Sequence, residues 1–64
     1  VNINLYINKM RIEAAKNHLL LSHESMADIA AAVGFNDPNY FSRIFSQIIG
    51  ISPTEFRRRF HQDI

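Results

Sequence analysis

The second half of the chain carries closely spaced signals for helix starts, and these limit the possible folds most strongly. Ser25 and Ser52 are residues of the type that caps helix N-termini, and each is followed three positions later by an acid, as in a capping box. Asp37-Pro38 joins a capping residue to a proline that fits the first helical position. The sequence therefore predicts three short helices in this half, and no strand.

Two glycines mark the ends of the first two of these helices. Gly34 and Gly50 each follow an apolar segment of helical spacing, and glycine most easily adopts the left-handed conformation that closes a helix. A short helix, a turn that contains glycine and a second helix form a helix-turn-helix. We therefore expect a helix-turn-helix over residues 25–50 and a closing helix within residues 51–64.

Residues 1–21 contain neither Gly nor Pro and predict one long helix. Its apolar residues fall on two sides at helical spacing. The first stripe comprises Ile3, Tyr6, Ile7, Met10, Ala14 and Leu21, and the second comprises Leu5, Ile12, Ala15 and Leu19. Two apolar stripes indicate a helix that is buried on two sides, which is unexpected in so short a chain. We expect the second stripe to need a partner outside these residues, or to drive self-association of the fragment.

The remaining apolar residues predict one shared core. Those expected to face inward are Met10, Met26, Ile29, Ala30, Val33, Phe35, Phe41, Ile44, Phe45, Ile48, Phe56 and Phe60. The arginines of residues 57–59 are expected to point outward, and residues 61–64 to fray. The predicted fold class is all-α, with four helices and one helix-turn-helix.

Size and composition exclude several classes of protein. A chain of 64 residues is at most one small domain or a part of one. Without cysteine it has neither a disulfide nor a thiolate-metal site. The sequence shows no signal peptide and no long apolar run, so we expect no membrane association and a cytoplasmic location. The net charge of +1 says little about partners, and the basic run at residues 57–59 fits a polyanion and a solvated helix end equally well.

Catalytic chemistry has little support. His18, His23 and His61 are not spaced as metal ligands, and the acids are too scattered to form a pair of catalytic carboxylates. We expect no catalytic residue, no metal and no cofactor, and we expect that the chain is not an enzyme.

The helix expected from Pro38 has an unusual polar side. It carries Asn39, Ser42, Arg43, Ser46 and Gln47, at spacings of three and four, with neither Lys nor Glu. Arg suits guanine in the major groove, Asn and Gln suit adenine, and Ser suits several groups. In a helix-turn-helix the N-terminal residues of the second helix lie deepest in the groove. In this chain those residues are Asn36, Pro38 and Asn39. The alternative is a plain solvated face.

Helix N-termini offer sites for DNA phosphates, because their free amides and the helix dipole attract anions. The residues expected to contact phosphates are Ser25, Met26, Ser46, Ser52, Thr54 and Arg57.

A short internal echo suggests a duplication. Residues 1–6 (VNINLY) match residues 51–56 (ISPTEF) in an apolar residue, a polar cap and an aromatic. Since residues 51–56 follow the helix-turn-helix, the residues before Val1 are expected to have ended another one. Together with the unpartnered stripe, the echo predicts that the chain is the second half of a duplicated domain.

Four runs in order closely resemble the AraC/XylS family of bacterial transcription regulators. They are RIEAAKNHLL (11–20), SMADIAAAVGF (25–35), YFSRIF (40–45) and GISPTEFR (50–57). The resemblance covers essentially the whole chain and is specific because the combination is ordered. It implies a homeodomain-like helix-turn-helix, in a DNA-binding domain that has two such units joined by a long helix. Residues 1–64 then represent a partial domain, made of the linker helix (1–21), the second unit (25–50) and the closing helix (51–64).

The resemblance also implies the function, which is sequence-specific binding of double-stranded DNA in transcription regulation, in the bacterial nucleoid. The positions that match family contacts to bases are Asn36, Pro38, Asn39, Ser42, Arg43 and Gln47. Pro38 stands where many relatives carry a polar residue, so its contact is apolar or absent. The alternative function is a helical protein-interaction fragment that uses the exposed stripe of the first helix, and RNA polymerase is the partner that the family suggests.

Overall fold

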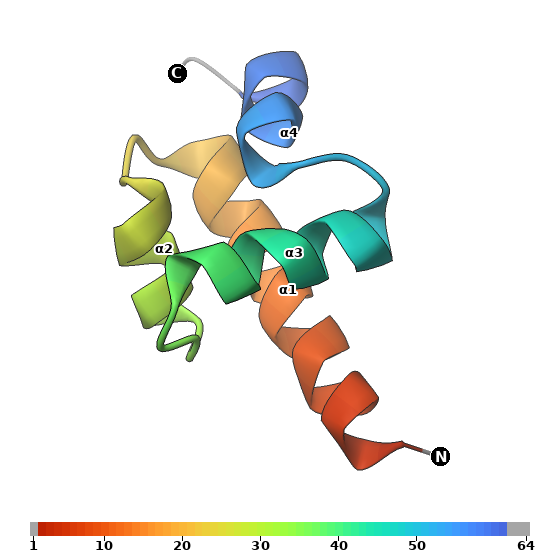
Figure 1. The fold of residues 1–64 in the computed structure, drawn as a ribbon. Coiled ribbons are helices and arrows are strands. Elements are labelled where there is room, and N and C mark those ends of the chain that lie inside the picture. Colours follow the sequence, from red (N-terminus) through yellow and green to blue (C-terminus); the bar gives the residue numbers. More distant parts are fainter. Residues whose placement is uncertain (1, 62–64) are drawn as a thin grey trace.

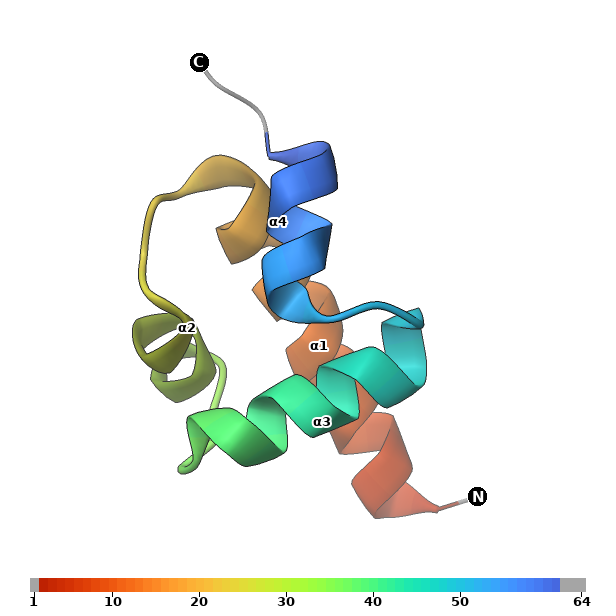
Figure 2. The same cartoon turned by 45° about the horizontal axis from the view of Figure 1, so that its top comes forward.

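The structure is a computed structural model that describes residues 2–61. This part of the chain contains four helices. They are α1 (Ile3–Leu21), α2 (Met26–Ala32), α3 (Pro38–Ile49) and α4 (Pro53–Phe60). α3 crosses α1, and α2 and α4 also contact α1 (Figure 1 and Figure 2). The start of α1 extends beyond the other helices in both views. The predicted all-α fold, with α2 and α3 as the helix-turn-helix, is confirmed.

Each helix begins at a polar cap. In all four cases a side-chain oxygen of the cap accepts a hydrogen bond from a backbone amide two or three residues later, which satisfies one of the free amides of the first turn. The four caps are Asn2, Ser25, Asp37 and Ser52. The three helix starts predicted in the second half of the chain are therefore correct.

The turn between α2 and α3 closes α2 in the way that its glycine predicts. Gly34 has a φ of 102°, and its amide donates to the carbonyl of Ala31 at 3.1 Å. The next amide, that of Phe35, donates back to Ala30 at 2.8 Å, which completes a Schellman motif. Phe35 is buried beneath this turn. The turn thus fixes where the chain leaves α2 and enters α3.

A chain of phenylalanine rings forms the centre of the core. The centroids of Phe35 and Phe41 lie 5.5 Å apart, those of Phe41 and Phe45 5.9 Å, and those of Phe45 and Phe56 5.5 Å. Tilted and edge-on contacts at these distances are favourable beyond the burial of area alone. The rings connect the helix-turn-helix to α4. α3 therefore packs against the turn that precedes it and against the helix that follows it.

The structure reverses the predicted roles of the two stripes of α1. Ile12, Ala15 and Leu19 of the second stripe are 0 % exposed and belong to the core. Most of the exposed apolar residues belong to the first stripe, with Ile3 at 69 % and Tyr6 at 58 %, whereas Leu5 of the second stripe is exposed at the start of α1. The prediction was wrong because α2, α3 and α4 all pack on the second stripe. Among residues 2–61, the side of α1 that lies exposed is therefore that of the first stripe, and not that of the second as predicted.

Two further predictions about burial are wrong. Met10 is 57 % exposed, because it lies on the outward side of α1. Phe60 is 51 % exposed, since it lies in the last turn of α4 and its ring contacts that of Phe56. α4 ends at Phe60, and the Nδ1 of the next residue, His61, lies 3.0 Å from the carbonyl oxygen of Leu19. The fraying expected from His61 stays a prediction. The fraying predicted for residues 62–64 lies outside the described residues.

None of the described helices, between residues 2 and 61, has the length and apolar character that crossing a bilayer requires.

Candidate nucleic-acid interface

α3 is anchored firmly on one side. Asp37 caps its start, with the carboxylate 2.9 Å from the amide of Asn39, and Pro38 occupies the first turn. Phe41 and Phe45 are fully buried on its inner face, while Ile44 and Ile48 pack partly against the core. Gly50, with a φ of 99°, ends the helix. The Asp37 carboxylate is thereby turned toward its own helix, as the cap assignment requires.

The outer side of α3 carries polar side chains without partners. Asn39, Arg43 and Gln47 are exposed, and Ser42 and Ser46 are half-buried beside them. None of these five side chains makes a hydrogen bond or ion pair with another group in the described part of the chain. Their donors and acceptors are therefore available to a partner from outside.

The residues before and at the start of α3 lie on the surface as well. Asn36 and Pro38 are both exposed. All six residues predicted to contact bases thus lie on α3 or directly before it, and all are at least partly accessible. Whether they contact DNA stays a prediction.

The N-termini of α2 and α4 show what the predicted phosphate residues do in the folded chain. Ser25 Oγ accepts from the amide of Asp28 at 3.1 Å, and Ser52 Oγ accepts from the amide of Glu55 at 3.1 Å. Thr54 is exposed and Met26 is half-buried. The reciprocal half of the capping box does not form at Ser52, because the Glu55 carboxylate binds arginines instead.

Arg57 does not point outward as predicted. Its guanidinium donates to the carbonyl of Glu24 at 2.7 Å, of Ser22 at 3.3 Å and of Leu19 at 3.4 Å. Arg57 is half-buried, and it binds α4 to the end of α1 and to the connection that leads into α2. A side chain held in this way is a poor candidate for the predicted phosphate contact, which no observation tests.

The other two arginines of α4 are bound to one carboxylate. Arg58 and Arg59 both donate to Glu55, with Arg59 Nε 2.7 Å from Oε2. The hydrogen bond from Arg58, and then that from Arg59, lowers the pKa of Glu55 below its ordinary value. The basic run is thus partly neutralised within α4, although its exposed ion pairs contribute little to stability.

A second carboxylate is held at the connection between α1 and α2. Glu24 Oε1 lies 2.7 Å from His18 Nδ1 and 3.0 Å from Ser22 Oγ. These contacts, chiefly the one with His18, lower the pKa of Glu24. Since Arg57 holds the carbonyl of the same residue, the connection is bound from both sides and delivers Ser25 to its capping position.

Comparisons with known proteins place this geometry in a family. The family model described as "Helix-turn-helix domain" matches residues 1–59. An uncharacterized HTH-type transcriptional regulator of Bacillus subtilis, YisR, is 47% identical over 53 residues, which are 83% of this chain and 18% of the relative. The HTH-type transcriptional activator RhaR of Pectobacterium carotovorum is 42% identical over 55 residues, 86% of this chain and 19% of the relative.

A solved structure has the same fold. The C-terminal domain of the two-component response regulator yesN from Fusobacterium nucleatum matches with a TM-score of 0.86 and 35% identity, over 89% of this chain and 55% of that one. The chain belongs to the AraC/XylS-type helix-turn-helix family. It spans about a fifth of the length of these curated relatives, and about half of the solved domain.

Membership in the AraC/XylS-type family supports DNA binding in transcription regulation, and the similar proteins are named as regulators of transcription, not as enzymes. The structure also shows a role that the sequence did not predict, which is that of Arg57. One signal for that role was present, because α1 ends at Leu21 without a glycine. The last carbonyls of such a helix need donors from elsewhere, and Arg57 and His61 supply them.

Proposed function

We propose that the chain binds double-stranded DNA sequence-specifically in transcription regulation, with α3 in the major groove. The observation that carries the proposal is the contrast between the two sides of α3. Its inner side is fixed by buried phenylalanines, whereas its outer side presents polar groups that have no partner in the described structure. A rigid helix with free donors and acceptors is what reading base edges requires.

The chemistry of the outer side assigns a role to each residue. Arg43 suits the O6 and N7 atoms of guanine, and Asn39 and Gln47 suit adenine. Ser42 adds a hydroxyl between them, and Asn36 a further amide at the start of the helix. Pro38 offers only an apolar contact, such as the methyl group of thymine.

Phosphate contacts would fix the register of α3 in the groove. The free amides at the starts of α2 and α4 are the proposed donors to phosphate, at Ser25, Met26, Ser52 and Thr54. Ser46 would contact the DNA backbone from α3. Arg57 is not among the proposed phosphate contacts, because its guanidinium is bound to three carbonyls.

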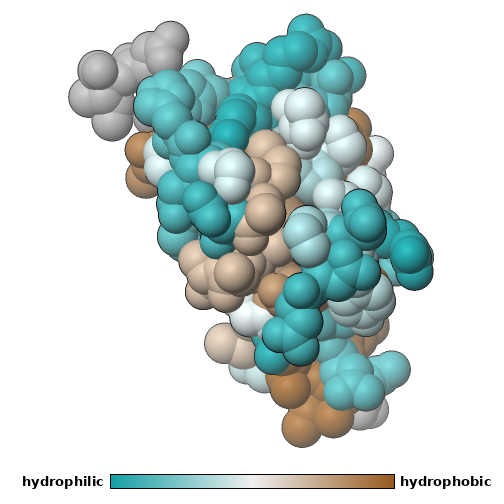
Figure 3. Space-filling model, turned by 60° about the vertical axis from the view of Figure 1, so that its left-hand side comes forward, coloured by the Kyte–Doolittle hydropathy of each residue, from teal (hydrophilic) through white to brown (hydrophobic). Residues whose placement is uncertain are grey.

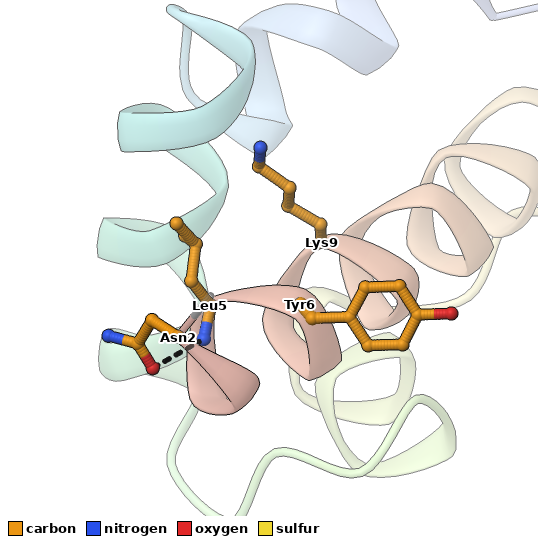
Figure 4. A pocket seen from close by; sticks show the side chains of 4 residues that line it. All are labelled: Asn2, Leu5, Tyr6 and Lys9. Atoms are coloured by element: carbon orange, nitrogen blue, oxygen red, sulfur yellow. Dashed lines mark hydrogen bonds between the residues drawn. The ribbon is translucent and has the colours of Figure 1, made fainter.

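The exposed side of α1 supports the proposal that the chain is half of a two-unit domain. Apolar atoms gather at the end of the molecule where α1 begins (Figure 3). Beside them lies a shallow hollow of about 240 Å³, lined by Asn2, Leu5, Tyr6 and Lys9 (Figure 4). We propose that a preceding helix-turn-helix unit covers this surface, since the solved relative is longer than the matched part. Location in the bacterial cytoplasm, at the nucleoid, follows from the proposed function.

The groove assignment is tested by one pair of variants. The intact protein selects duplexes from a random pool, and affinities for the selected duplex and a scrambled one are then compared. Arg43→Ala should lose about 1–3 kcal/mol of specific binding. The matched control is Arg58→Ala, which removes an exposed arginine of α4 and should leave the preference unchanged. If Arg43→Ala retains the full preference, α3 does not read bases through this residue.

The isolated chain gives a second test. A fragment with few cationic contacts should bind DNA weakly, with a shallow dependence on salt. Nanomolar specific binding by a monomer of residues 1–64 would contradict the half-domain proposal.

A second candidate function is a protein-interaction module that uses the exposed side of α1. The observation in its favour is the set of exposed apolar residues of the first stripe, Ile3, Tyr6, Ile7 and Met10. RNA polymerase or a second copy of the chain would be the partner. Retention on heparin that salt abolishes supports DNA binding, whereas self-association that is insensitive to salt supports an apolar interface.

A further inference from the structure

Arg11, in the middle of α1, reaches the turn of the helix-turn-helix. Its Cζ lies 5.5 Å from the centroid of the Phe35 ring. A Cβ atom placed on Gly34 would lie 3.1 Å from Arg11 Nε and 3.3 Å from Cζ. The guanidinium therefore packs against the ring of one turn residue and the bare backbone of the residue before it.

The two positive-φ glycines differ in what surrounds them. Gly50 has a φ of 99°, and a Cβ there would meet nothing within 4 Å, so only its backbone conformation favours glycine. Gly34 has both a left-handed φ and a close neighbour, the Arg11 side chain. The absence of a side chain at Gly34 therefore leaves room for Arg11, whereas no side chain packs against Gly50 in this way.

Phe35, which Arg11 contacts, packs in turn against the start of α3. The Phe35 ring lies 5.9 Å from that of Tyr40 and 5.5 Å from that of Phe41, both in the first turn of α3. Asn36, the first of the proposed base-contacting residues, follows Phe35 directly. A change in the tilt of the Phe35 ring would therefore change the entry of α3.

The Arg11 guanidinium has no hydrogen-bonded acceptor and no ion-pair partner among residues 2–61, so its contact with the turn consists of packing and a cation–π interaction. A lysine ammonium has the same charge but lacks the planar guanidinium, so it does not reproduce packing against both the Phe35 ring and the Gly34 backbone. We propose that Arg11 is a positioning residue, which sets the turn and the start of α3 and thereby the sequence preference of the domain. This inference rests on the proposed function.

The test compares Arg11→Lys, which keeps the charge, with Arg11→Gln, which removes it. Lys16→Gln is the matched control, since Lys16 is a cation of the same helix whose ion pair is with its neighbour Glu13. The first readout needs no DNA and is the hydrogen exchange of the Gly34 and Phe35 amides, which donate to Ala31 and Ala30. Both Arg11 variants should accelerate this exchange by roughly two- to five-fold, as expected for the loss of a cation–π contact.

The second readout uses the intact protein, a duplex that the wild type selects from a random pool, and a scrambled duplex of the same composition. Both variants should reduce the ratio of the two affinities by roughly the same two- to five-fold. The dependence of affinity on salt should be unchanged in both, and Lys16→Gln should leave the exchange and the affinity ratio unaltered.

Two results would overturn the inference. One is unchanged exchange of the turn amides in both variants. The other is a wild-type affinity ratio in Arg11→Lys together with a salt slope that falls by about 1 in Arg11→Gln, because that is the signature of a phosphate contact. A wild type that prefers no duplex would refute the proposed function, and the exchange measurement would still decide the role of Arg11.

Discussion

α3 and α4 both present arginine to the surface, but they use it differently. α4 carries three arginines in succession, and all of them have partners within the chain. Arg57 binds three backbone carbonyls, and Arg58 and Arg59 bind Glu55. α3 carries one arginine, Arg43, and the described structure gives it no partner.

The comparison shows that the density of charge is a poor guide to the binding surface in this chain. The basic run of α4 carries more charge than α3, yet its arginines already bind Glu55 and the backbone. The polar side of α3 has less charge, but its groups are free and the helix beneath them is fixed. Availability of donors on a rigid element, and not their number, distinguishes the two helices.

The largest expected effect comes from the ring that both helices share. Phe45 is fully buried and contacts Phe41 on one side and Phe56 of α4 on the other. Phe45→Ala should reduce the free energy of unfolding by about 3–5 kcal/mol, which is most of the stability of so small a domain. Thermal and urea unfolding followed by circular dichroism measure the loss.

Phe60→Ala is the control for that variant. Phe60 is half-exposed on the same helix, and its ring contacts only Phe56 among the aromatic rings of residues 2–61. Its loss should be clearly smaller. Equal losses from the two variants would mean that the phenylalanine chain does not anchor α3.

The second-largest expected effect distinguishes Arg57, which binds backbone carbonyls, from Arg43, which is proposed to contact bases. Arg57→Met should lower the free energy of unfolding by about 2–3 kcal/mol, because carbonyls at the end of α1 lose a charged donor. The ratio of specific to nonspecific DNA affinity should stay near that of the wild type. Arg43→Ala should show the reverse, with unfolding unchanged and specific affinity reduced. If Arg57→Met instead reduces affinity without destabilising the fold, Arg57 contacts DNA as the sequence predicted.

The sequence was sufficient for the helices but not for their contacts. Caps and glycines are local signals, so Ser25, Asp37, Gly34 and Gly50 predicted where the helices begin and end. The buried side of α1 could not be predicted in the same way, since both of its stripes have helical spacing. Only the packing of three other helices on Ile12, Ala15 and Leu19 decides between them.

The candidate site shows the same limit. The outer side of α3 could be predicted because it depends on spacing within one helix. The roles of Arg57 and Arg11 could not, because each depends on a residue far away in the sequence. Arg57 reaches carbonyls 33 to 38 residues earlier, and Arg11 reaches the turn at Gly34 and Phe35.

A smaller effect tests whether the arginines of α4 are held back from DNA. Glu55→Gln removes the carboxylate that Arg58 and Arg59 share. Nonspecific affinity for a scrambled duplex should rise, and the salt slope should steepen by up to about 1, as expected for one further charge near phosphate. Sequence preference should not change, because α3 is untouched. A variant whose salt slope matches that of the wild type would show that α4 lies away from the DNA.

The smallest effect is on stability in acid. The pKa of Glu24 is lowered, mainly by the hydrogen bond with His18, and that of Glu55 is lowered, mainly by Arg58. A carboxyl whose pKa is lower in the folded state contributes stability above its unfolded pKa, and this contribution disappears as pH falls through the folded pKa. The melting temperature should therefore fall as pH drops below the ordinary carboxyl range, and it should fall less in Glu24→Gln and Glu55→Gln.

Of the two variants, Glu24→Gln should flatten the acid dependence more. Glu24 lies at the connection that Arg57 binds, where the loss of its contacts with His18 and Ser22 loosens the link between α1 and α2. Glu55 is bound only by exposed arginines of its own helix, and such pairs contribute little. Melting curves at a series of pH values would measure both, with Glu13→Gln as the control for an exposed carboxylate on α1. An equal response from Glu55 and Glu24 would mean that the connection into α2 is no more tightly held than the surface of α4.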